Sequence, residues 1–375
     1  MKILLTGGGT GGHFYPIIAI VEQINSLMRE WKLMEAKIYF MSDGPYDSKM
    51  LYENNIKFLK APAGKRRRYF SLLNITDVFK TAWGIVKSVI LIFSIYPDVV
   101  FGKGGYASFP ALFAARLLRI PVIIHESDST PGKVSLWASK FARRIAISYP
   151  ESADFFPKDK VAYTGNPVRS GILGTGVEGA YQYLKLEEGI PILLIIGGSL
   201  GAKTINDIVM TCLPDLVKNY QIIHQTGRIH FNEVNTLSKA ILLNNSNKDR
   251  YKCFDYIDDL GMRMAASVAS LVISRAGSAI FEIAAWGIPS IIIPITDSNG
   301  DHQRKNAFNY ARTGAAIVIE EINLNASIFT LQIDHLIQNT EKLAFMKQQA
   351  LQFAKLDAAN KIARQILEIA LEHEN

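Results

Sequence analysis

The chain alternates short apolar runs with segments of helical length, and it does so in both halves. The apolar runs in the first half are residues 2–6, 37–41, 98–102 and 121–126; those in the second half are residues 191–198, 221–227, 270–277 and 289–295. Strands that alternate with helices are typical of parallel sheets wound with helices. The pattern therefore predicts an α/β protein with two doubly wound Rossmann-like domains facing a central cleft, and ligands at the carboxyl ends of the strands.

The domain boundary is expected near TGNPVRSGI (164–172), where glycine, asparagine and proline occur together without periodicity. A length of 375 residues exceeds what one hydrophobic core usually supports. We therefore expect an N-terminal domain over residues 1–165 and a C-terminal domain over residues 166–375. The last helical stretch, residues 342–372, could pack on either domain.

Composition excludes several classes of protein. Apolar residues make up 49% of the chain and charged residues 20%, which argues against disorder. Two cysteines, Cys212 and Cys253, allow neither a disulfide framework nor a cysteine zinc site, and no His, Asp or Glu spacing resembles a metal site. We expect no metal and no cofactor. The N-terminus has no secretory pattern and no uninterrupted apolar run approaches the roughly 18 residues of a membrane span, so we expect a cytoplasmic protein.

Positive charge is concentrated in the first part of the chain. Residues 1–166 carry 22 Lys and Arg against 13 Asp and Glu, whereas residues 167–375 carry 19 against 21. KRRRYFSLLNITDVFKTAWG (65–84) joins basic residues to an aromatic and apolar stripe, which favours attachment to an anionic membrane surface. A core helix with a solvated basic start and a nucleic-acid patch are the alternatives. No nucleic-acid fold signature accompanies the segment, so nucleic acid is not an expected partner.

Four glycine-rich loops follow predicted strands, at residues 7–13, 101–108, 197–203 and 274–282. The first matches G-x-G-x-x-G through Gly7, Gly9 and Gly12, a pattern that dinucleotide-binding proteins share with others. Such loops let backbone N–H groups and helix N-termini approach a diphosphate. Any single one of them could instead be only a tight turn.

Several side chains near these loops are candidates for chemistry. His13 stands at a helix N-terminus, which favours the neutral imidazole that a general base needs, although a lone histidine is often structural. Glu282 lies within an apolar helix, where two ribose hydroxyls or an ordinary ion pair could satisfy its carboxylate. Glu126 and Asp128, beside His125 at a strand end, could orient a sugar or provide a second base.

The motifs together resemble the MurG family of membrane-associated N-acetylglucosaminyltransferases. The matching segments are GGGTGGHFYP (7–16), FGKGGYASFP (101–110), HESDSTPG (125–132), GNPVR (165–169), GGSLGAKTIN (197–206), HQTG (224–227), YIDD (256–259), SRAGSAIFEIAAWGIPSIIIP (274–294) and DHQRKNA (301–307). The resemblance implies a GT-B fold and transfer of N-acetylglucosamine from UDP-N-acetylglucosamine to the muramoyl C4 hydroxyl of lipid I, with inversion, giving lipid II. It also implies a peripheral location at the cytoplasmic face of the cell membrane.

The resemblance also assigns residues. By position, Ile257 would lie by the uracil, Glu282 on the ribose, Ser199 with Gly277, Ser278 and Ala279 on the diphosphate, and Gln303 on the sugar. The residues that would line the acceptor side or the transferred sugar are Thr10, Gly11, Gly12, His13, Asp128, Asn166 and Arg169. Many members have asparagine where this chain has Asp128, so an anion replaces a neutral amide there.

Two other functions share part of this pattern. Another GT-B enzyme could make a different glycolipid from a UDP-sugar. A nicotinamide-dependent dehydrogenase, or a non-catalytic nucleotide-binding module, would use the first glycine loop for a dinucleotide. The dehydrogenase normally places its ribose carboxylate about 20 residues beyond the glycines. Here the nearest acid at a strand end, Asp43, comes about 31 residues after Gly12.

Overall fold

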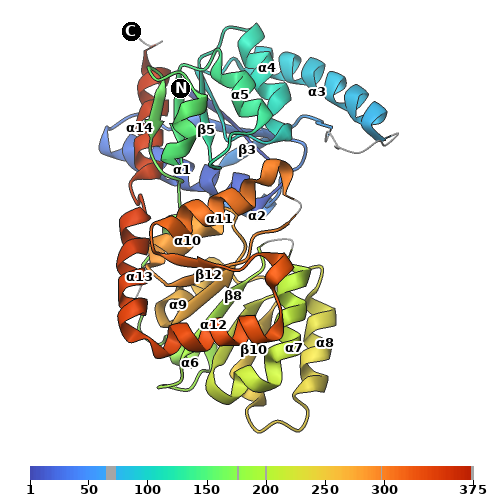
Figure 1. Ribbon diagram of the computed structural model, residues 1–375. Helices are drawn as coiled ribbons and strands as arrows, with labels where there is room; N and C mark the ends of the chain where they lie inside the picture. Colours follow the sequence, from blue (N-terminus) through green and yellow to red (C-terminus); the bar gives the residue numbers. More distant parts are fainter. Residues whose placement is uncertain (65–72, 175–176, 199–200, 297, 373–375) are drawn as a thin grey trace. The chain divides into compact units, whose positions relative to one another are not determined.

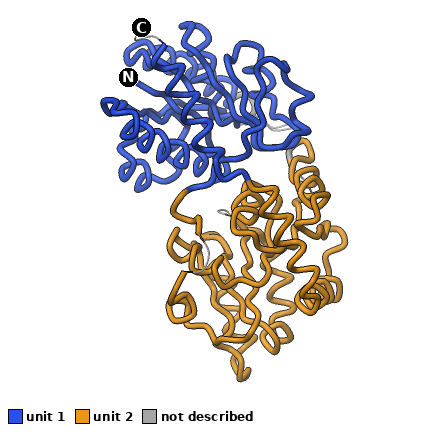
Figure 2. Tube along the Cα trace, turned by 90° about the vertical axis from the view of Figure 1, so that its left-hand side faces the viewer, with its two compact units in different colours: residues 1–169, 355–375 blue, residues 170–354 orange. Residues whose placement is uncertain are grey.

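The chain folds into two compact units, each built on a parallel sheet (Figures 1 and 2). The computed structural model describes residues 1–64, 73–174, 177–198, 201–296 and 298–372. Unit 1 is Met1–Arg169 together with Lys355–Asn375, and unit 2 is Ser170–Ala354. The fold class predicted from the alternating apolar runs, two doubly wound α/β domains, is confirmed.

Unit 1 has a seven-stranded sheet with the order β3-β2-β1-β4-β5-β6-β7. Its elements are β1 (Lys2–Thr6), α1 (Gly11–Glu30), β2 (Lys37–Ser42), α2 (Ser48–Glu53), β3 (Ile56–Lys60), α3 (Leu73–Ile95), β4 (Val99–Gly102), α4 (Phe109–Leu117), β5 (Val122–Glu126), α5 (Lys133–Ser139), β6 (Arg144–Ile147), β7 (Val161–Tyr163) and α14 (Ala358–Leu371). Side chains alternate across each strand. Ile3 and Leu5 therefore pack on α1 and α14, whereas Leu4 packs with Ile92 of α3 and Leu112 of α4.

The C-terminal helix α14 belongs to unit 1. Its Ile362 and Ile366 lie in the same core cluster as Phe14 and Ile17 of α1. The sequence-based division, 1–165 and 166–375, therefore differs from the two units at residues 166–169 and 355–375. The apolar stripe on this helix predicts that one face is buried, but it does not predict which neighbouring element covers that face.

Unit 2 has a six-stranded sheet with the order β10-β9-β8-β11-β12-β13. Its elements are α6 (Ala180–Leu184), β8 (Ile192–Ile196), α7 (Lys203–Asn219), β9 (Gln221–Gln225), α8 (Phe231–Ile241), β10 (Tyr251–Phe254), α9 (Asp259–Val268), β11 (Leu271–Ser274), α10 (Ala279–Trp286), β12 (Ser290–Ile292), α11 (His302–Arg312), β13 (Ala316–Val318), α12 (Ala326–Gln338) and α13 (Thr340–Phe353). Leu193 and Ile195 of β8 pack with residues of α7 and α12. Because β8, β11 and β12 run parallel, the loops that follow them open at the same edge of this sheet.

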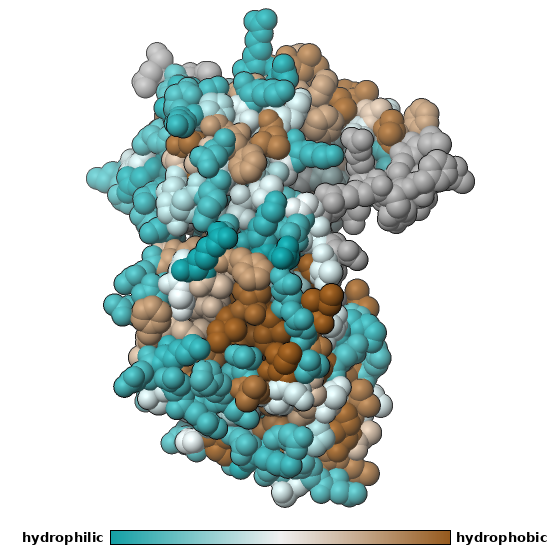
Figure 3. Space-filling model, in the orientation of Figure 1, coloured by the Kyte–Doolittle hydropathy of each residue, from teal (hydrophilic) through white to brown (hydrophobic). Residues whose placement is uncertain are grey.

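Helix α3 leaves one apolar face uncovered. By length and composition alone, Thr76–Ile95 could cross a membrane. Its apolar sequence is interrupted by Lys80 and Lys87, so it contains no uninterrupted apolar run of that length. The helix packs along α4 inside unit 1, with Ile92 fully buried. Its opposite side carries apolar side chains that are 49% to 71% exposed and recur every three or four residues: Phe79, Trp83, Val86, Ile90 and Phe93. Figure 3 shows this apolar surface along α3.

Candidate active site

The first glycine loop, residues 7–13, connects β1 to α1 at the carboxyl edge of the sheet. Gly9 has a φ of 82°, a conformation that L side chains rarely adopt. A Cβ on Gly8 would lie 2.5 Å from Ser42 Oγ, so glycine is needed there for the loop to pack closely. Helix α1 begins directly after Thr10. The predicted residues Thr10, Gly11, Gly12 and His13 therefore all stand at a helix N-terminus.

His13 is held at its Nδ1, and its imidazole is uncharged, as the predicted role of general base would require. Its Nδ1 lies 3.0 Å from Thr10 Oγ1, and its Nε2 faces Gly105, whose Cβ, if present, would lie 3.4 Å away. Burial and the positive charge of Lys103 lower the pKa of His13 to about 4, against an opposing effect of Asp128. The imidazole is therefore neutral at pH 7. Because Thr10 holds Nδ1, Nε2 is the nitrogen that can take a proton from a substrate.

Glu126 shapes the loop that carries Asp128. Its Oε1 accepts a hydrogen bond of 3.1 Å from the Asp128 N–H, and its Oε2 accepts one of 3.0 Å from the Gly132 N–H. Burial and the neighbouring Asp128 raise the pKa of Glu126, while these hydrogen bonds oppose the rise. Both oxygens are thus engaged within the chain, which suits a positioning role better than that of a base. The neighbouring His125 is also structural, since its Nε2 lies 3.0 Å from the Gly165 carbonyl oxygen.

Asn166 and Arg169 come from the segment that leaves unit 1. Asn166 is buried, and its Oδ1 accepts a hydrogen bond of 3.2 Å from Lys103 Nζ. The Arg169 guanidinium lies 3.9 Å from the centroid of the Tyr15 ring, which places it against α1. The structure thus gathers the predicted acceptor-side residues around the loops after β1 and β5. It adds Lys103, which the sequence analysis did not single out among the residues of the FGKGG loop.

In unit 2 the predicted donor residues that the structure describes lie in loops, or in the first turns of helices, at the carboxyl edge of the sheet. Gly277, Ser278 and Ala279 form the N-terminus of α10, and Glu282 is half-buried in the first turn of that helix. The Ile257 N–H donates to Gln225 Oε1 at 3.0 Å, and the Ile295 N–H donates to Gln303 Oε1 at 3.2 Å. Ser199 lies outside the described residues.

The first glycine loop of unit 2, residues 197–203, packs closely at Gly201 on the segment that follows β9. Gly201 has a φ of 80°, and a Cβ there would lie 2.4 Å from the Thr226 carbonyl oxygen. Helix α7 begins just beyond it, at Lys203. The N-termini of α7 and α10 thus both open at the carboxyl edge of the sheet, as an anionic ligand would require.

An ion pair holds Ile293 and Thr296, which precede α11, the helix that carries Gln303. Arg275 Nη2 lies 2.5 Å from Glu321 Oε1, and its Nη1 donates to the Ile293 carbonyl oxygen at 3.0 Å. Glu321 Oε2 accepts hydrogen bonds of 2.9 Å from both the N–H and the hydroxyl of Thr296. The two charged side chains are only 9% and 16% exposed, so removing either one would leave the other as an uncompensated buried charge.

We expect Glu321→Gln to destabilise unit 2 by about 3 kcal/mol at pH 7, since it leaves Arg275 without its partner. Burial raises the pKa of Glu321, but the Thr296 hydrogen bonds and Arg275 outweigh it, so the folded-state pKa lies below the ordinary 4.5. This stabilisation is present above pH 4.5 and is lost as the pH falls through the lower folded-state pKa. Calorimetry should therefore show that the difference in free energy of unfolding between the wild type and Glu321→Gln is smaller at pH 4 than at pH 7.

Glu320→Gln is the matched control for this prediction. Glu320 pairs with Arg304 at the surface, at 2.6 Å, where solvent screening leaves an ion pair with little effect on stability. Equal losses for the two variants would contradict the role of the Arg275 and Glu321 pair.

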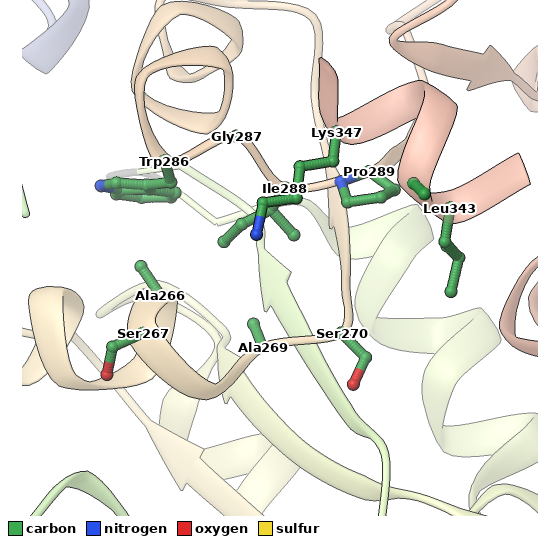
Figure 4. Close-up of a pocket in the computed structure, with 11 residues that line it drawn as sticks. Ala266, Ser267, Ala269, Ser270, Trp286, Gly287, Ile288, Pro289, Leu343 and Lys347 are labelled. Atoms are coloured by element: carbon green, nitrogen blue, oxygen red, sulfur yellow. The ribbon is translucent and has the colours of Figure 1, made fainter. Parts of the chain in front are cut away.

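A hollow of about 230 Å³ in unit 2 lies away from these loops (Figure 4). It is lined by Trp286 and Lys347 and by residues that precede strands, such as Ser270 before β11 and Pro289 before β12. It therefore opens at the amino edge of the sheet and is no part of the candidate donor site.

Within the described part of the chain, no group of three or more His, Cys, Asp or Glu side chains could hold a metal ion. Cys212 is buried and Cys253 half-buried, and both are free thiols.

Comparison with known families covers most of the chain. Residues 3–147 match the glycosyltransferase family 28 N-terminal domain, and residues 192–363 match the glycosyltransferase family 28 C-terminal domain. A Bacillus cereus protein named UDP-N-acetylglucosamine--N-acetylmuramyl-(pentapeptide) pyrophosphoryl-undecaprenol N-acetylglucosamine transferase 2 is 37% identical over 91% of this chain and 93% of its own length. A Listeria welshimeri protein named as the same transferase is 33% identical over 98% of this chain and 99% of its own length.

Solved structures share the fold. The crystal structure of Acinetobacter baumannii MurG has a TM-score of 0.71 at 24% identity and covers 98% of this chain and 99% of its own. The S. aureus MnaA–UDP co-structure has a TM-score of 0.70 at 16% identity and covers 98% of both chains.

Proposed function

Because this chain belongs to the MurG family within glycosyltransferase family 28, we propose that unit 2 binds the sugar donor and unit 1 binds the acceptor and activates it. The protein is a GT-B glycosyltransferase that transfers N-acetylglucosamine from UDP-N-acetylglucosamine to lipid I, giving lipid II for peptidoglycan synthesis. The observation that carries this conclusion is the identity of 33% to 37% with the named transferases over nearly the whole chain. Family membership also sets aside the dehydrogenase alternative.

The donor proposal rests on the loops of unit 2. The diphosphate would lie between the N-termini of α7 and α10, where backbone N–H groups and helix dipoles stabilise negative charge. Glu282, one turn into α10, would accept hydrogen bonds from the two ribose hydroxyls. Ile257 would contact the uracil, and Gln303 would donate to the sugar while its Oε1 holds Ile295. These groups would also stabilise the UDP that leaves.

In unit 1, we propose that His13 is the general base that activates the acceptor. Nε2 of the neutral imidazole takes the proton of the muramoyl C4 hydroxyl as its oxygen attacks the anomeric carbon of N-acetylglucosamine. The new bond to C1 forms while the bond from C1 to the UDP oxygen breaks, so the anomeric configuration inverts in one displacement. The transition state resembles an oxocarbenium ion. The Nδ1–H of His13 would donate a hydrogen bond to Thr10 Oγ1, which fixes the ring. The Asp128 loop would position the sugar of the acceptor.

The test of this function is a transfer assay with a choice of acceptors. We expect labelled N-acetylglucosamine to move from the UDP-sugar to lipid I and not to diacylglycerol, which separates this enzyme from other GT-B glycolipid synthases. Titration calorimetry should show binding of UDP and none of NAD. Transfer to diacylglycerol alone, or binding of NAD in place of UDP, would contradict the proposal.

The exposed stripe on α3 is a surface for the membrane that holds the acceptor lipid. We infer that the protein is peripheral at the cytoplasmic face, because α3 packs on α4 by one side and presents apolar side chains on the other. Lys80 on this helix pairs with Asp43, which ties its start to the loop after β2. The basic residues 65–68, expected to add attraction to anionic lipid, lie outside the described residues.

Replacing Trp83, Ile90 and Phe93 by serine should lower binding to vesicles containing anionic lipid by more than tenfold. Each buried apolar side chain is worth about 1.5–3 kcal/mol, although partial insertion reduces this. Co-sedimentation of the protein with vesicles measures the effect. The matched control replaces three apolar side chains of unit 2 that are also more than 60% exposed, Leu243, Ile322 and Leu331. Vesicle binding that falls equally in both triple variants would argue against a specific role for α3.

A further inference from the structure

Lys103 carries a buried ammonium group next to the proposed acceptor site. It follows β4 directly and precedes Gly104 and Gly105, both of which have positive φ. Only 1% of its surface is exposed. Lysine is almost never buried to this extent without partners, because removing its charge from water costs several kcal/mol. The partners of this group therefore indicate its role.

Two of these partners are oxygen atoms on separate segments. Lys103 Nζ donates to Ser127 Oγ at 2.8 Å and to Asn166 Oδ1 at 3.2 Å. Ser127 precedes Asp128 in the loop after β5, and Asn166 belongs to the segment that leaves unit 1. One ammonium group thus joins both segments to the loop after β4, which also borders His13 through Gly105.

The remaining partners are charges. Burial lowers the pKa of Lys103 to about 8, against the opposing effect of Glu126 and Asp128, so the ammonium stays charged at pH 7. Lys103 and Asp128 act in opposite directions on the pKa of His13, the cation lowering it and the anion raising it. His125 also lies within reach of both Lys103 and His13. Among the described residues, Glu126, Asp128 and His125 are thus the titratable groups that act on His13 or Lys103.

We propose that Lys103 is a positioning residue of the acceptor site, which joins the Asp128 loop to Asn166 and balances the charge of Asp128 beside His13. The proposal rests on the proposed function in one respect, the use of His13 as the base. An aspartate at position 128 would by itself favour a protonated His13, which cannot accept a proton. The buried cation offsets this effect while its hydrogen bonds keep the loop in place.

The test separates the charge of Lys103 from its hydrogen bonds. Lys103→Gln keeps a neutral donor, Lys103→Met removes both charge and donor, and Asp128→Asn removes the opposing charge. For each protein, NMR of labelled histidine reports the pKa of His13, and the pH profile of kcat/KM reports its effect on transfer. We expect both Lys103 variants to move the pKa of His13, and the acid limb of the profile, upward by about one pH unit.

The combined variant completes the design. Lys103→Gln with Asp128→Asn should bring the His13 pKa back to within a few tenths of a unit of its original value. Misfolding of a single Lys103 variant, with recovery of folding in the combined variant, would also support charge balance. An unmoved His13 pKa in folded Lys103→Gln would overturn the proposal. A His13 pKa that moves while the acid limb stays in place would instead contradict His13 as the base, which leaves the role of Lys103 intact.

Discussion

His13→Ala is expected to lower kcat by about 10²- to 10⁴-fold, the usual contribution of a positioned general base. The affinity for UDP-N-acetylglucosamine should not change, because the proposed donor residues all lie in unit 2. Steady-state transfer to lipid I and calorimetry with the donor measure the two quantities separately. A loss of donor affinity as large as the loss of kcat would indicate a damaged fold instead of a missing base.

Thr10→Val is the informative companion to this variant. It keeps the shape of the side chain but removes the oxygen that lies 3.0 Å from His13 Nδ1. We expect a loss of about tenfold in kcat, smaller than for His13→Ala, because the imidazole remains but its orientation is no longer fixed. Unchanged turnover in His13→Ala would move the base to another group. Asp128 would then be the better candidate, since both carboxylate oxygens of Glu126 are bonded to the loop.

Proton abstraction by His13 should slow in acid, because protonation of the imidazole removes the base. The base must be unprotonated, and burial with Lys103 holds the pKa of His13 at about 4. Turnover limited by His13 should therefore stay constant from pH 8 down to about pH 5 and fall only in stronger acid. A histidine with the ordinary pKa of 6.5 would instead lose half of its activity near that pH.

The sequence predicted the centre of each sheet better than its edges. The apolar runs 2–6 and 191–198 became β1 and β8, which lie inside their sheets and are buried on both faces. The strands that were not predicted lie at a sheet edge, as β3, β7, β10 and β13 do, or next to one, as β6 does. An outer strand needs fewer apolar residues and is easily mistaken for a loop. The packing of α14 on α1 depends on contacts between distant parts of the chain, which periodicity does not reveal.

The candidate site was predictable only where a motif identified it. Glycine loops mark His13 and the N-terminus of α10, because glycine followed by a helix is a local signal. Lys103 lies in the second glycine loop, residues 101–108, but no local signal distinguishes its side chain from that of a solvent-exposed lysine. Its burial depends on Ser127 and Asn166, which are 24 and 63 residues away in the chain. A lysine after a strand usually reaches solvent, so its role becomes visible only when the segments are folded together.

Glu282→Ala is expected to lower the affinity for UDP about 100-fold or more. A carboxylate that accepts two ribose hydroxyls makes two charged hydrogen bonds, each worth about 1.5–3 kcal/mol. Its place in the first turn of α10 puts the carboxylate close to the proposed diphosphate site. Titration calorimetry with UDP measures the loss, and Glu282→Gln should be intermediate because it keeps one acceptor oxygen without the charge.

Ligands that lack a hydroxyl test whether this loss comes from the ribose. The wild-type protein should bind 2′-deoxy-UDP and 3′-deoxy-UDP more weakly than UDP, whereas Glu282→Ala should bind all three equally, since the partner of both hydroxyls is gone. Gln303→Ala is the control within the same unit: it should weaken binding of UDP-N-acetylglucosamine but not of UDP, because Gln303 is assigned to the sugar. If Glu282→Ala still distinguishes UDP from its deoxy forms, the ribose contact belongs to another residue, and the role of Glu282 is to hold α10 in place.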